Sequence, residues 1–224
     1  MVTIISIIIP ALNEARHIRE TLLRLQPLRE RGHEVIVVDG GSDDTTPALA
    51  APLADAVLVS PAGRSVQMAT GAERARGAIL WFLHADTLVP PEADRAIHDA
   101  LQRRQWGRFD VALSGHHPML RMVERMINLR SRLSGIATGD QGIFLRTGLY
   151  REIGGMPQQP LMEDVELSRR LRRHGRPACL KQTLQTSSRR WEEHCILRTI
   201  FLMWGLRAAY ALGVPATRLA GLYK

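Results

Sequence analysis

Three short polar segments stand out in the N-terminal half of the chain because their side chains could hold a charged or polar ligand. They are Pro10-Ala11-Leu12-Asn13-Glu14, Asp39-Gly40-Gly41-Ser42-Asp43-Asp44 and His84-Ala85-Asp86. Each segment follows an apolar run and contains at least one carboxylate. Parallel strands of one sheet place their carboxyl ends at the same edge, where ligands bind. The sequence therefore predicts a polar ligand site at that edge.

Apolar, β-branched runs alternate with helix-like spacing over the first 105 residues, and this alternation would position the three segments. Strands are expected at 4–9, 34–39, 56–59 and 79–83, and helices at 14–30, 45–51, 65–76 and 91–105, with Asn13 capping the first helix. The less regular second half predicts strands at 109–113 and 142–146, and helices at 119–133, 164–174 and beyond 191. The pattern favours an α/β fold, a mostly parallel sheet with helices on both faces.

Composition indicates one large domain, because the chain has 224 residues of which 45% are hydrophobic. The first ten residues are expected to form a strand rather than a signal peptide, and Cys179 and Cys195 to be free thiols in the cytoplasm. The net charge of +8 is concentrated in residues 165–224, which hold 12 Lys or Arg against 3 Asp or Glu. Such a basic surface suits phosphates, nucleic acid or anionic lipid.

The order and spacing of the motifs resemble the family 2 glycosyltransferases of the GT-A fold, over about residues 4–191. Besides the three polar segments, the matching motifs are Gly63-Arg64, Gly71-Ala72, Gly77, Gly139-Asp140-Gln141-Gly142, Gly154-Gly155-Met156-Pro157 and Glu163-Asp164. The resemblance implies a GT-A domain over 1–191, with a nucleotide-binding half (1–105) and an acceptor-side half (106–191). A basic, apolar helical tail over 192–224 would follow.

The resemblance also implies a hexosyltransferase-like enzyme whose donor is a nucleoside diphosphate sugar, with a UDP-sugar favoured. The residues implied to bind the nucleotide are Pro10, Ala11, Asn13, Glu14, Asp39, Arg64, His84 and Ala85. Asp39 would accept a hydrogen bond from the base, usually uracil. For Arg64, an ordinary solvated surface position is the alternative.

Asp86 matches the last acid of the family's DxD motif and is implied to bind Mg²⁺ or Mn²⁺. These cations prefer hard oxygen ligands and share them with phosphates. The metal would offset the charge that builds on the departing diphosphate. The chain departs from the motif at its first acid, where His84 stands. His84 could contact a phosphate, bind Mn²⁺ or simply fill space.

The pair Glu163-Asp164 matches the acidic pair whose Asp is the catalytic base in this family, which inverts the anomeric centre by direct displacement. The attacking hydroxyl must lose its proton, so a carboxylate must lie within hydrogen-bond reach. We assign Asp164 as the base and Glu163 as a neighbour that orients or contacts the acceptor. Stabilising the start of a helix is a compatible alternative role.

Further motif residues are implied to contact the donor sugar or the acceptor, and these are Asp140, Gln141, Arg189, Arg190 and Trp191. A simple turn is the alternative for Asp140, which lies next to glycine. The segment 187–191 partly matches the QxxRW motif of processive members, with Ser187 in place of Gln. A long polymer product is therefore not expected. The acceptor could be lipid-linked, a saccharide or a small molecule.

The tail is apolar from 199 to 217, but Arg207 and two glycines interrupt it. A spanning helix needs about 20 mostly apolar residues, so spanning is not expected. Two alternatives remain open. The tail could lie as a peripheral helix on the inner leaflet of the membrane, or it could pack on the core or in a homodimer interface.

Three other functions compete with that of a glycosyltransferase. A nucleotidyltransferase usually has a Gly-rich basic loop after its first strand, and residues 10–14 lack one. A nucleic-acid-binding module would fit the basic tail, but aromatic residues are only 5% of the chain and none alternate with arginines, so no nucleic-acid partner is expected. A catalytically inactive GT-A scaffold is suggested by His84 alone.

Overall fold

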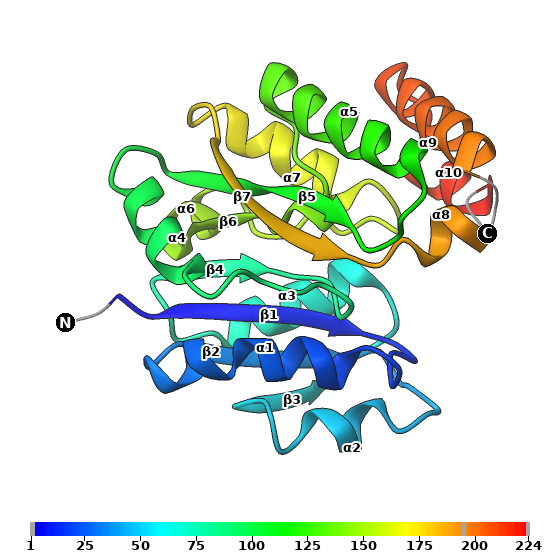
Figure 1. The fold of residues 1–224 in the computed structure, drawn as a ribbon. Coiled ribbons are helices and arrows are strands. Elements are labelled where there is room, and N and C mark those ends of the chain that lie inside the picture. Colours follow the sequence, from blue (N-terminus) through cyan, green and yellow to red (C-terminus); the bar gives the residue numbers. More distant parts are fainter. Residues whose placement is uncertain (1–2, 194–195, 223–224) are drawn as a thin grey trace.

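The computed structural model describes residues 3–193 and 196–222, and within them seven strands form one sheet in the order β3-β2-β1-β4-β6-β5-β7 (Figure 1). The strands are β1 (Ile5–Ala11), β2 (Glu34–Asp39), β3 (Ala56–Val59), β4 (Ile79–Phe82), β5 (Trp106–Leu113), β6 (Phe144–Arg146) and β7 (Ala178–Thr186). Neighbouring strands are parallel except β6, which runs antiparallel to β4 and β5. The predicted mostly parallel sheet is confirmed.

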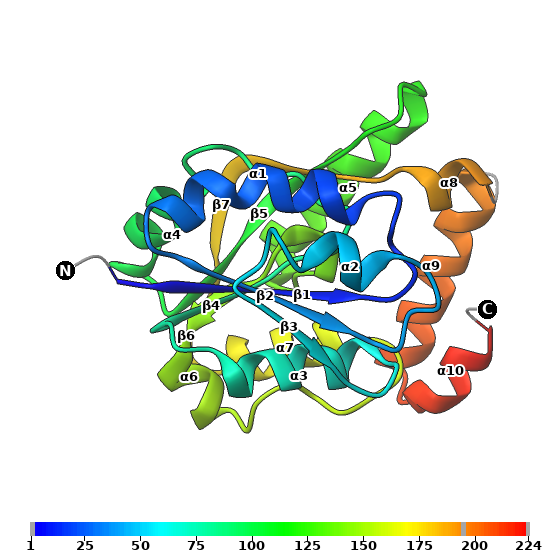
Figure 2. The ribbon, with the colours of Figure 1, turned by 90° about the horizontal axis from the view of Figure 1, so that it is seen from below.

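Helices cover both faces of the sheet, as Figure 2 shows from below. One face carries α1 (Ile18–Glu30), α2 (Thr46–Ala50) and α4 (Ala93–Leu101). The other carries α3 (Arg64–Arg74), α6 (Thr147–Glu152) and α7 (Glu163–Arg172). The long helix α5 (Pro118–Ser134) and the short 3₁₀ helix η1 (Gly139–Gln141) lie beside the β5–β6 part of the sheet.

The core is divided between the two faces because successive side chains of a strand point to opposite sides. Ile7 and Ile9 of β1 pack with α1 and α4, whereas Ile8 packs with α3 and α7. Every residue of β1 and β2 is buried, which explains why these strands are apolar without alternation. A sheet buried on both sides fixes the loops at its carboxyl edge.

The first helix begins later than the sequence suggested, and Asn13 does not cap it. Asn13 adopts a left-handed backbone conformation (φ 56°), and its side-chain oxygen accepts a hydrogen bond from the backbone N–H of Asp43 at 3.0 Å. A turn follows, in which the backbone oxygen of Glu14 accepts from His17, and the helix begins at Ile18. The helix-capping prediction was wrong because Asn13 joins two loops instead.

The C-terminal residues form α8 (Arg189–Glu193), α9 (Ile196–Ala211) and α10 (Ala216–Leu222), so the expected helix beyond 191 is confirmed. Ile196 of α9 packs with Leu120 and Val123 of α5, and Leu206 packs with Leu219 of α10. In the part of the chain that the structure describes, no helix combines the length and hydropathy needed to cross a membrane.

Candidate active site

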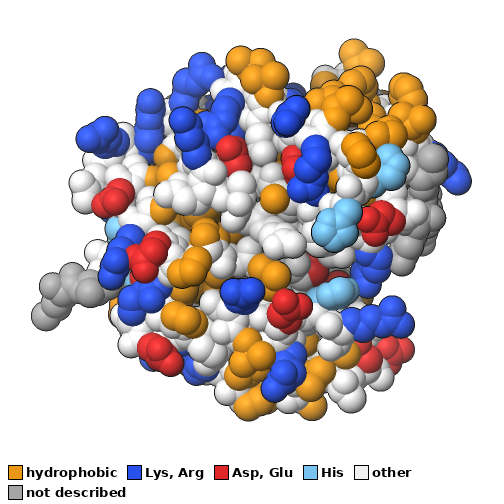
Figure 3. Space-filling model, viewed as in Figure 1, with side chains coloured by type: hydrophobic (Ala, Val, Ile, Leu, Met, Phe, Trp, Pro, Cys, Tyr) orange, Lys and Arg blue, Asp and Glu red, His pale blue; other side chains and the backbone are white. Residues whose placement is uncertain are grey.

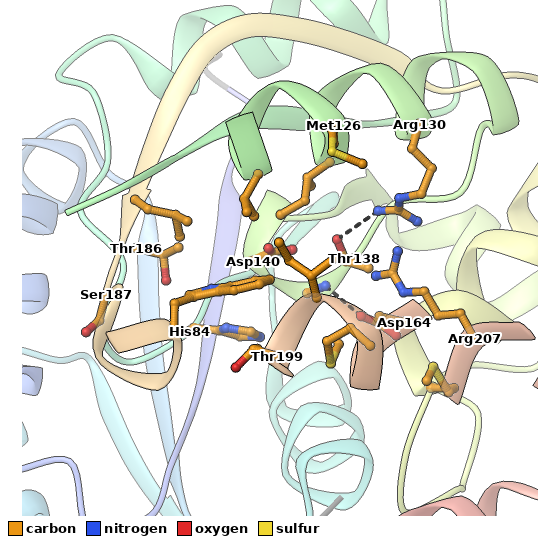
Figure 4. Close-up of a pocket in the computed structure, with 18 of the residues that line it drawn as sticks. His84, Met126, Arg130, Thr138, Asp140, Asp164, Thr186, Ser187, Thr199 and Arg207 are labelled. Atoms are coloured by element: carbon orange, nitrogen blue, oxygen red, sulfur yellow. Dashed lines mark hydrogen bonds between the residues drawn. The ribbon is translucent and has the colours of Figure 1, made fainter. Parts of the chain in front are cut away.

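A cavity of about 440 Å³ lies where the chain leaves β4 and β7, between η1, the start of α7, α5 and α9 (Figure 4). Eight of the predicted site residues line it, namely Arg64, His84, Asp86, Asp140, Glu163, Asp164, Arg189 and Trp191. They come from both halves of the chain and from separate elements. The expected convergence of polar segments at the carboxyl edge therefore holds for the segment at 84–86.

His84 forms one wall of the cavity and is held in a tightly packed position. A Cβ atom at Gly139 would lie 2.5 Å from Nε2 of His84, so only glycine fits beside the ring without a shift. Nε2 also lies 3.5 Å from a guanidinium nitrogen of Arg64. Burial, followed by the charge of Arg64, lowers the pKa of His84. The ring is therefore neutral at pH 7 and can offer a lone pair to a cation or one N–H to a phosphate.

Asp86 and Glu14 lie close enough for their charges to interact. Oδ1 of Asp86 accepts a hydrogen bond from Oγ1 of Thr186 at 3.2 Å. Oε2 of Glu14 is buried and has no hydrogen-bond partner among the described residues. Burial, followed by the negative charge of Asp86, raises the pKa of Glu14. A cation bound between these carboxylates would relieve both effects.

The carboxylates of Asp86 and Glu14 determine whether a divalent metal could bind here. No cluster of three or more His, Cys, Asp and Glu side chains suited to a metal occurs in residues 3–193 and 196–222. The chain instead offers Asp86, with Glu14 in its field. Mg²⁺ is commonly held by one or two carboxylates together with substrate phosphates. The residues present therefore fit a metal that arrives with, or is completed by, a diphosphate.

The two acids at the start of α7 occupy different surroundings. Glu163 is 4% exposed, and its carboxylate lies 3.3 Å from Nε of Arg64. Burial, followed by the charge of Asp164, raises the pKa of Glu163. Asp164 is only partly buried, and its Oδ2 accepts a hydrogen bond from the backbone N–H of Gly139 at 2.8 Å. This bond orients the Asp164 carboxylate beside the cavity.

Asp140 and Gln141 are adjacent in η1, but their side chains make different contacts. Oδ1 of Asp140 is buried at the cavity and has no hydrogen-bond partner among the described residues, so it can accept from a ligand hydroxyl. Gln141 is fully buried, accepts from the backbone N–H of Thr138 at 3.2 Å, and donates to Asn128 at 3.4 Å. Gln141 does not line the cavity and holds η1 against α5 instead.

The remaining nucleotide-site predictions lie outside this cavity, in or beside the loops after β1, β2 and β4. They are Pro10, Ala11, Asn13, Glu14, Asp39 and Ala85. Asp39 is 3% exposed and accepts hydrogen bonds from the backbone N–H groups of Gly41 and Ser42, both at 2.9 Å, and from Oγ of Ser42 at 2.5 Å. These bonds fix the 39–42 turn. Ala85 packs its side chain in the core.

Arg189 and Trp191 of α8 line the cavity. The side chain of Arg190, which was predicted to contact the donor sugar or the acceptor, lies outside the described part of the structure. The partial QxxRW segment is thus represented at the site by Arg189 and Trp191.

Several cavity residues were missed by the sequence analysis because they belong to segments with no recognisable motif, most of them in α5 and α9. They are Met126, Ile127, Arg130, Thr138, Thr186, Thr199, Ile200, Met203, Trp204 and Arg207. Those on α5 and α9 form an apolar wall facing the polar residues, with Arg130 and Arg207 in it. Arg207 was expected to interrupt an apolar run and to face the phosphates of a membrane surface, and local sequence carried no signal that α9 closes the site.

Comparison with known proteins gives a family and a fold. The family model described as glycosyl transferase family 2 matches residues 6–128, which is more than half of the chain. No sequence match was found among curated proteins.

Solved structures match the fold at low sequence identity. TarS 1–349 of S. aureus is 18% identical, with a TM-score of 0.64, 83% of this chain and 60% of that chain covered. The mannosyltransferase PcManGT of Pyrobaculum calidifontis is 20% identical, with a TM-score of 0.64. The match covers 83% of this chain and 57% of that chain. Glucosyl-3-phosphoglycerate synthase of Mycobacterium tuberculosis is 21% identical, with a TM-score of 0.62. The match covers 82% of this chain and 71% of that chain. The chain spans about three fifths of the length of the first two.

The family match covers the strands and loops that form the nucleotide-side half of the sheet, and the structural matches extend the likeness over most of the chain. The seven-stranded, mostly parallel sheet of the described residues agrees with both. The chain belongs to glycosyl transferase family 2 and has the GT-A fold.

Proposed function

We propose that this protein transfers a sugar from a nucleoside diphosphate sugar, with a UDP-sugar favoured, to an acceptor hydroxyl with inversion at the anomeric carbon. One observation carries the proposal: a single cavity is lined both by Asp86, the remaining acid of the DxD motif, and by Asp164, the acid assigned as base. A reaction that expels a diphosphate and deprotonates a hydroxyl needs both groups in one site.

The donor class is supported by what similar structures contain. TarS 1–349 was solved in complex with UDP-GlcNAc, and PcManGT in complex with GDP-Man and Mn²⁺. The M. tuberculosis synthase was solved with Mn²⁺ and UDP. The preference for uridine rests on Asp39, whose ordered turn would present a carboxylate to the base.

We further propose that Asp86 holds Mg²⁺ or Mn²⁺ together with the donor diphosphate, with Glu14 and His84 beside it. When bound, the metal supplies positive charge to the leaving diphosphate. The neutral ring of His84 can donate to a phosphate oxygen or coordinate Mn²⁺. Arg64 and Arg189, which also line the cavity, add positive charge at this end.

Asp164 would act as the general base. The oxygen of the acceptor hydroxyl forms a bond to the anomeric carbon, the bond from that carbon to the diphosphate oxygen breaks, and the hydroxyl proton passes to a carboxylate oxygen of Asp164. The hydrogen bond from Gly139 keeps the carboxylate oriented, and Asp140 offers an unused acceptor for a sugar or acceptor hydroxyl.

The test combines ligand binding with turnover in variants of the two acids. With wild type, UDP and Mn²⁺ together should raise the melting temperature, because a ligand that binds only the native state stabilises it. Asp86→Ala should abolish the metal-dependent part of this shift. Asp164→Asn should retain the shift but lower release of UDP from the donor about 10²–10⁴-fold.

Asp99→Asn is a matched control, because Asp99 is exposed on α4, away from the cavity. It should behave as wild type in both measurements. A wild-type protein that shows no shift with any nucleoside diphosphate and metal would rule out the proposal.

We also propose that α9 and α5 contact a membrane surface. Their outer faces expose Met122, Leu129, Leu133, Leu197, Phe201 and Leu202. Figure 3 shows hydrophobic side chains gathered over these two helices, with Lys and Arg side chains nearby. An apolar face flanked by basic residues suits the boundary of an anionic bilayer.

A further inference from the structure

Two arginines from different helices converge on the acceptor side of the cavity without an acidic partner. Arg130 comes from α5 and Arg207 from α9, and Figure 4 shows their guanidinium groups close together above Asp164. Arg130 donates one hydrogen bond, to Oγ1 of Thr138 at 3.5 Å. Nε of Arg207 is buried and has no hydrogen-bond partner among the described residues. Most of the donor capacity of the two groups is thus unused.

The arrangement is electrostatically costly unless an anion is present. Burial, followed by the charge of Arg207, lowers the pKa of Arg130 to about 10. Neither arginine forms an ion pair with Asp or Glu in the described part of the chain. Two guanidinium groups placed together with free N–H donors match the geometry of a phosphate or carboxylate, which accepts paired hydrogen bonds from arginine.

The pair lies apart from the place expected for the donor diphosphate. Thr186, which is bonded to Asp86, lies across the cavity from the arginines in Figure 4, whereas Asp164 lies beside the arginines. The acids whose charges act on Arg130 are Asp140 and Asp164, not Asp86. An anion bound by these arginines would therefore lie beside Asp164, the residue assigned as base, and across the cavity from the residue that is bonded to Asp86.

We propose that Arg130 and Arg207 bind an anionic group of the acceptor, a phosphate or a carboxylate, and thereby place its hydroxyl against Asp164. This inference rests on the proposed transferase function and narrows the acceptor to a negatively charged molecule. Met126, Met203 and Trp204 line the same wall, so the part of the acceptor next to the anion meets apolar side chains.

The experiment measures binding of small anions with the donor site filled. Wild type saturated with UDP and Mn²⁺ is titrated with glycerol phosphate, lactate and, as a neutral reference, glycerol. At least one anion should bind, glycerol should not, and Arg130→Gln and Arg207→Gln should each weaken the anion at least tenfold. Arg125→Gln is the matched control, since Arg125 is exposed on α5 and does not line the cavity.

Four results decide the outcome. Equal anion affinity in wild type and both variants, or no anion binding at all, overturns the inference. Retention of the UDP and Mn²⁺ shift in both variants shows that they fold and that donor binding is intact. Failure of that shift in wild type would instead count against the proposed function, and the anions would then be titrated alone.

Vesicles of phosphatidic acid that bind in the same arginine-dependent way would assign the anion to a lipid headgroup, and their failure to bind assigns it to a soluble acceptor.

Discussion

Glu163 and Asp164 show how neighbouring carboxylates acquire different properties from their contacts. Asp164 is half-buried, bonded to a backbone N–H and beside the cavity. Glu163 is buried against Arg64, which also approaches His84. Glu163 therefore lies between Asp164, the proposed base, and Arg64 and His84, which are proposed to bind near the diphosphate. We assign it a positioning role, since its carboxylate is already occupied by an arginine.

The raised pKa of Glu163 predicts a pH-dependent cost in stability. Burial and the adjacent Asp164 favour the protonated acid in the folded protein. As pH rises from the unfolded pKa, near 4.3, to the folded pKa, the unfolded chain ionises first and the folded state loses stability. Above the folded pKa the loss is constant.

Glu163→Gln should therefore raise the free energy of unfolding relative to wild type at pH 8, and the difference should disappear as the pH falls below the unfolded pKa of about 4.3. Urea unfolding at several pH values measures it. Glu73→Gln, at an exposed site on α3, should show no such trend. A Glu163→Gln difference that grows toward low pH would contradict this account.

At the scale of elements, α3 is held against the sheet at Gly71. A Cβ atom there would lie 2.5 Å from Cγ2 of Ile8 and 3.1 Å from Cγ2 of Val38. With glycine at position 71, the helix approaches β1 and β2 more closely than it could with any other residue type there. Because Arg64 begins this helix, its distance from the sheet also sets where Arg64 meets Glu163.

Gly71→Ala should overpack this contact and lower the free energy of unfolding by about 1–3 kcal/mol. Gly148→Ala in α6 is the control, because no other atom lies within 4 Å of the position that a Cβ would occupy there. That change should be neutral or slightly stabilising, since alanine favours helix. Chemical denaturation of both variants tests the contrast, and equal stabilities would refute it.

Strands buried on both faces could be predicted from sequence, whereas the edge strand β7 and the short helix α6 could not. Strands β1, β2 and β4 were expected because unbroken apolar runs require burial on two sides. Strand β7 was missed because it lies at the sheet edge with mostly exposed or half-buried polar residues. The six-residue α6 was missed as well, since it is too short to show helical periodicity.

At the scale of the molecule, the exposed faces of α5 and α9 predict attachment to anionic vesicles. Wild type should float with vesicles rich in anionic lipid, and the double variant Leu197→Ser, Phe201→Ser should float several-fold less, because these side chains are 51% and 68% exposed on α9. Val59→Ser is the control, as Val59 is 76% exposed on β3. Absence of wild-type flotation rules out membrane contact.

The polar side of the cavity was predictable from the sequence, but its other side was not. Motifs with characteristic spacing pointed to His84, Asp86, Asp140 and Asp164, and all four line the cavity. Arg130 and Arg207 lie 77 positions apart, in helices whose sequences resemble ordinary amphipathic or apolar segments. Only the packing of α9 on α5 brings them together, and this contact leaves no local pattern.

The wall formed by α5 and α9 packs through small clusters that contain no residue of β1 to β4. Substitutions in this wall can therefore alter its shape and charge while leaving the two main cores intact. The chemistry that releases the leaving group and the surface that selects the acceptor are thus free to diverge separately. A lineage could change what it glycosylates by altering two helices, with the donor and the fold unchanged.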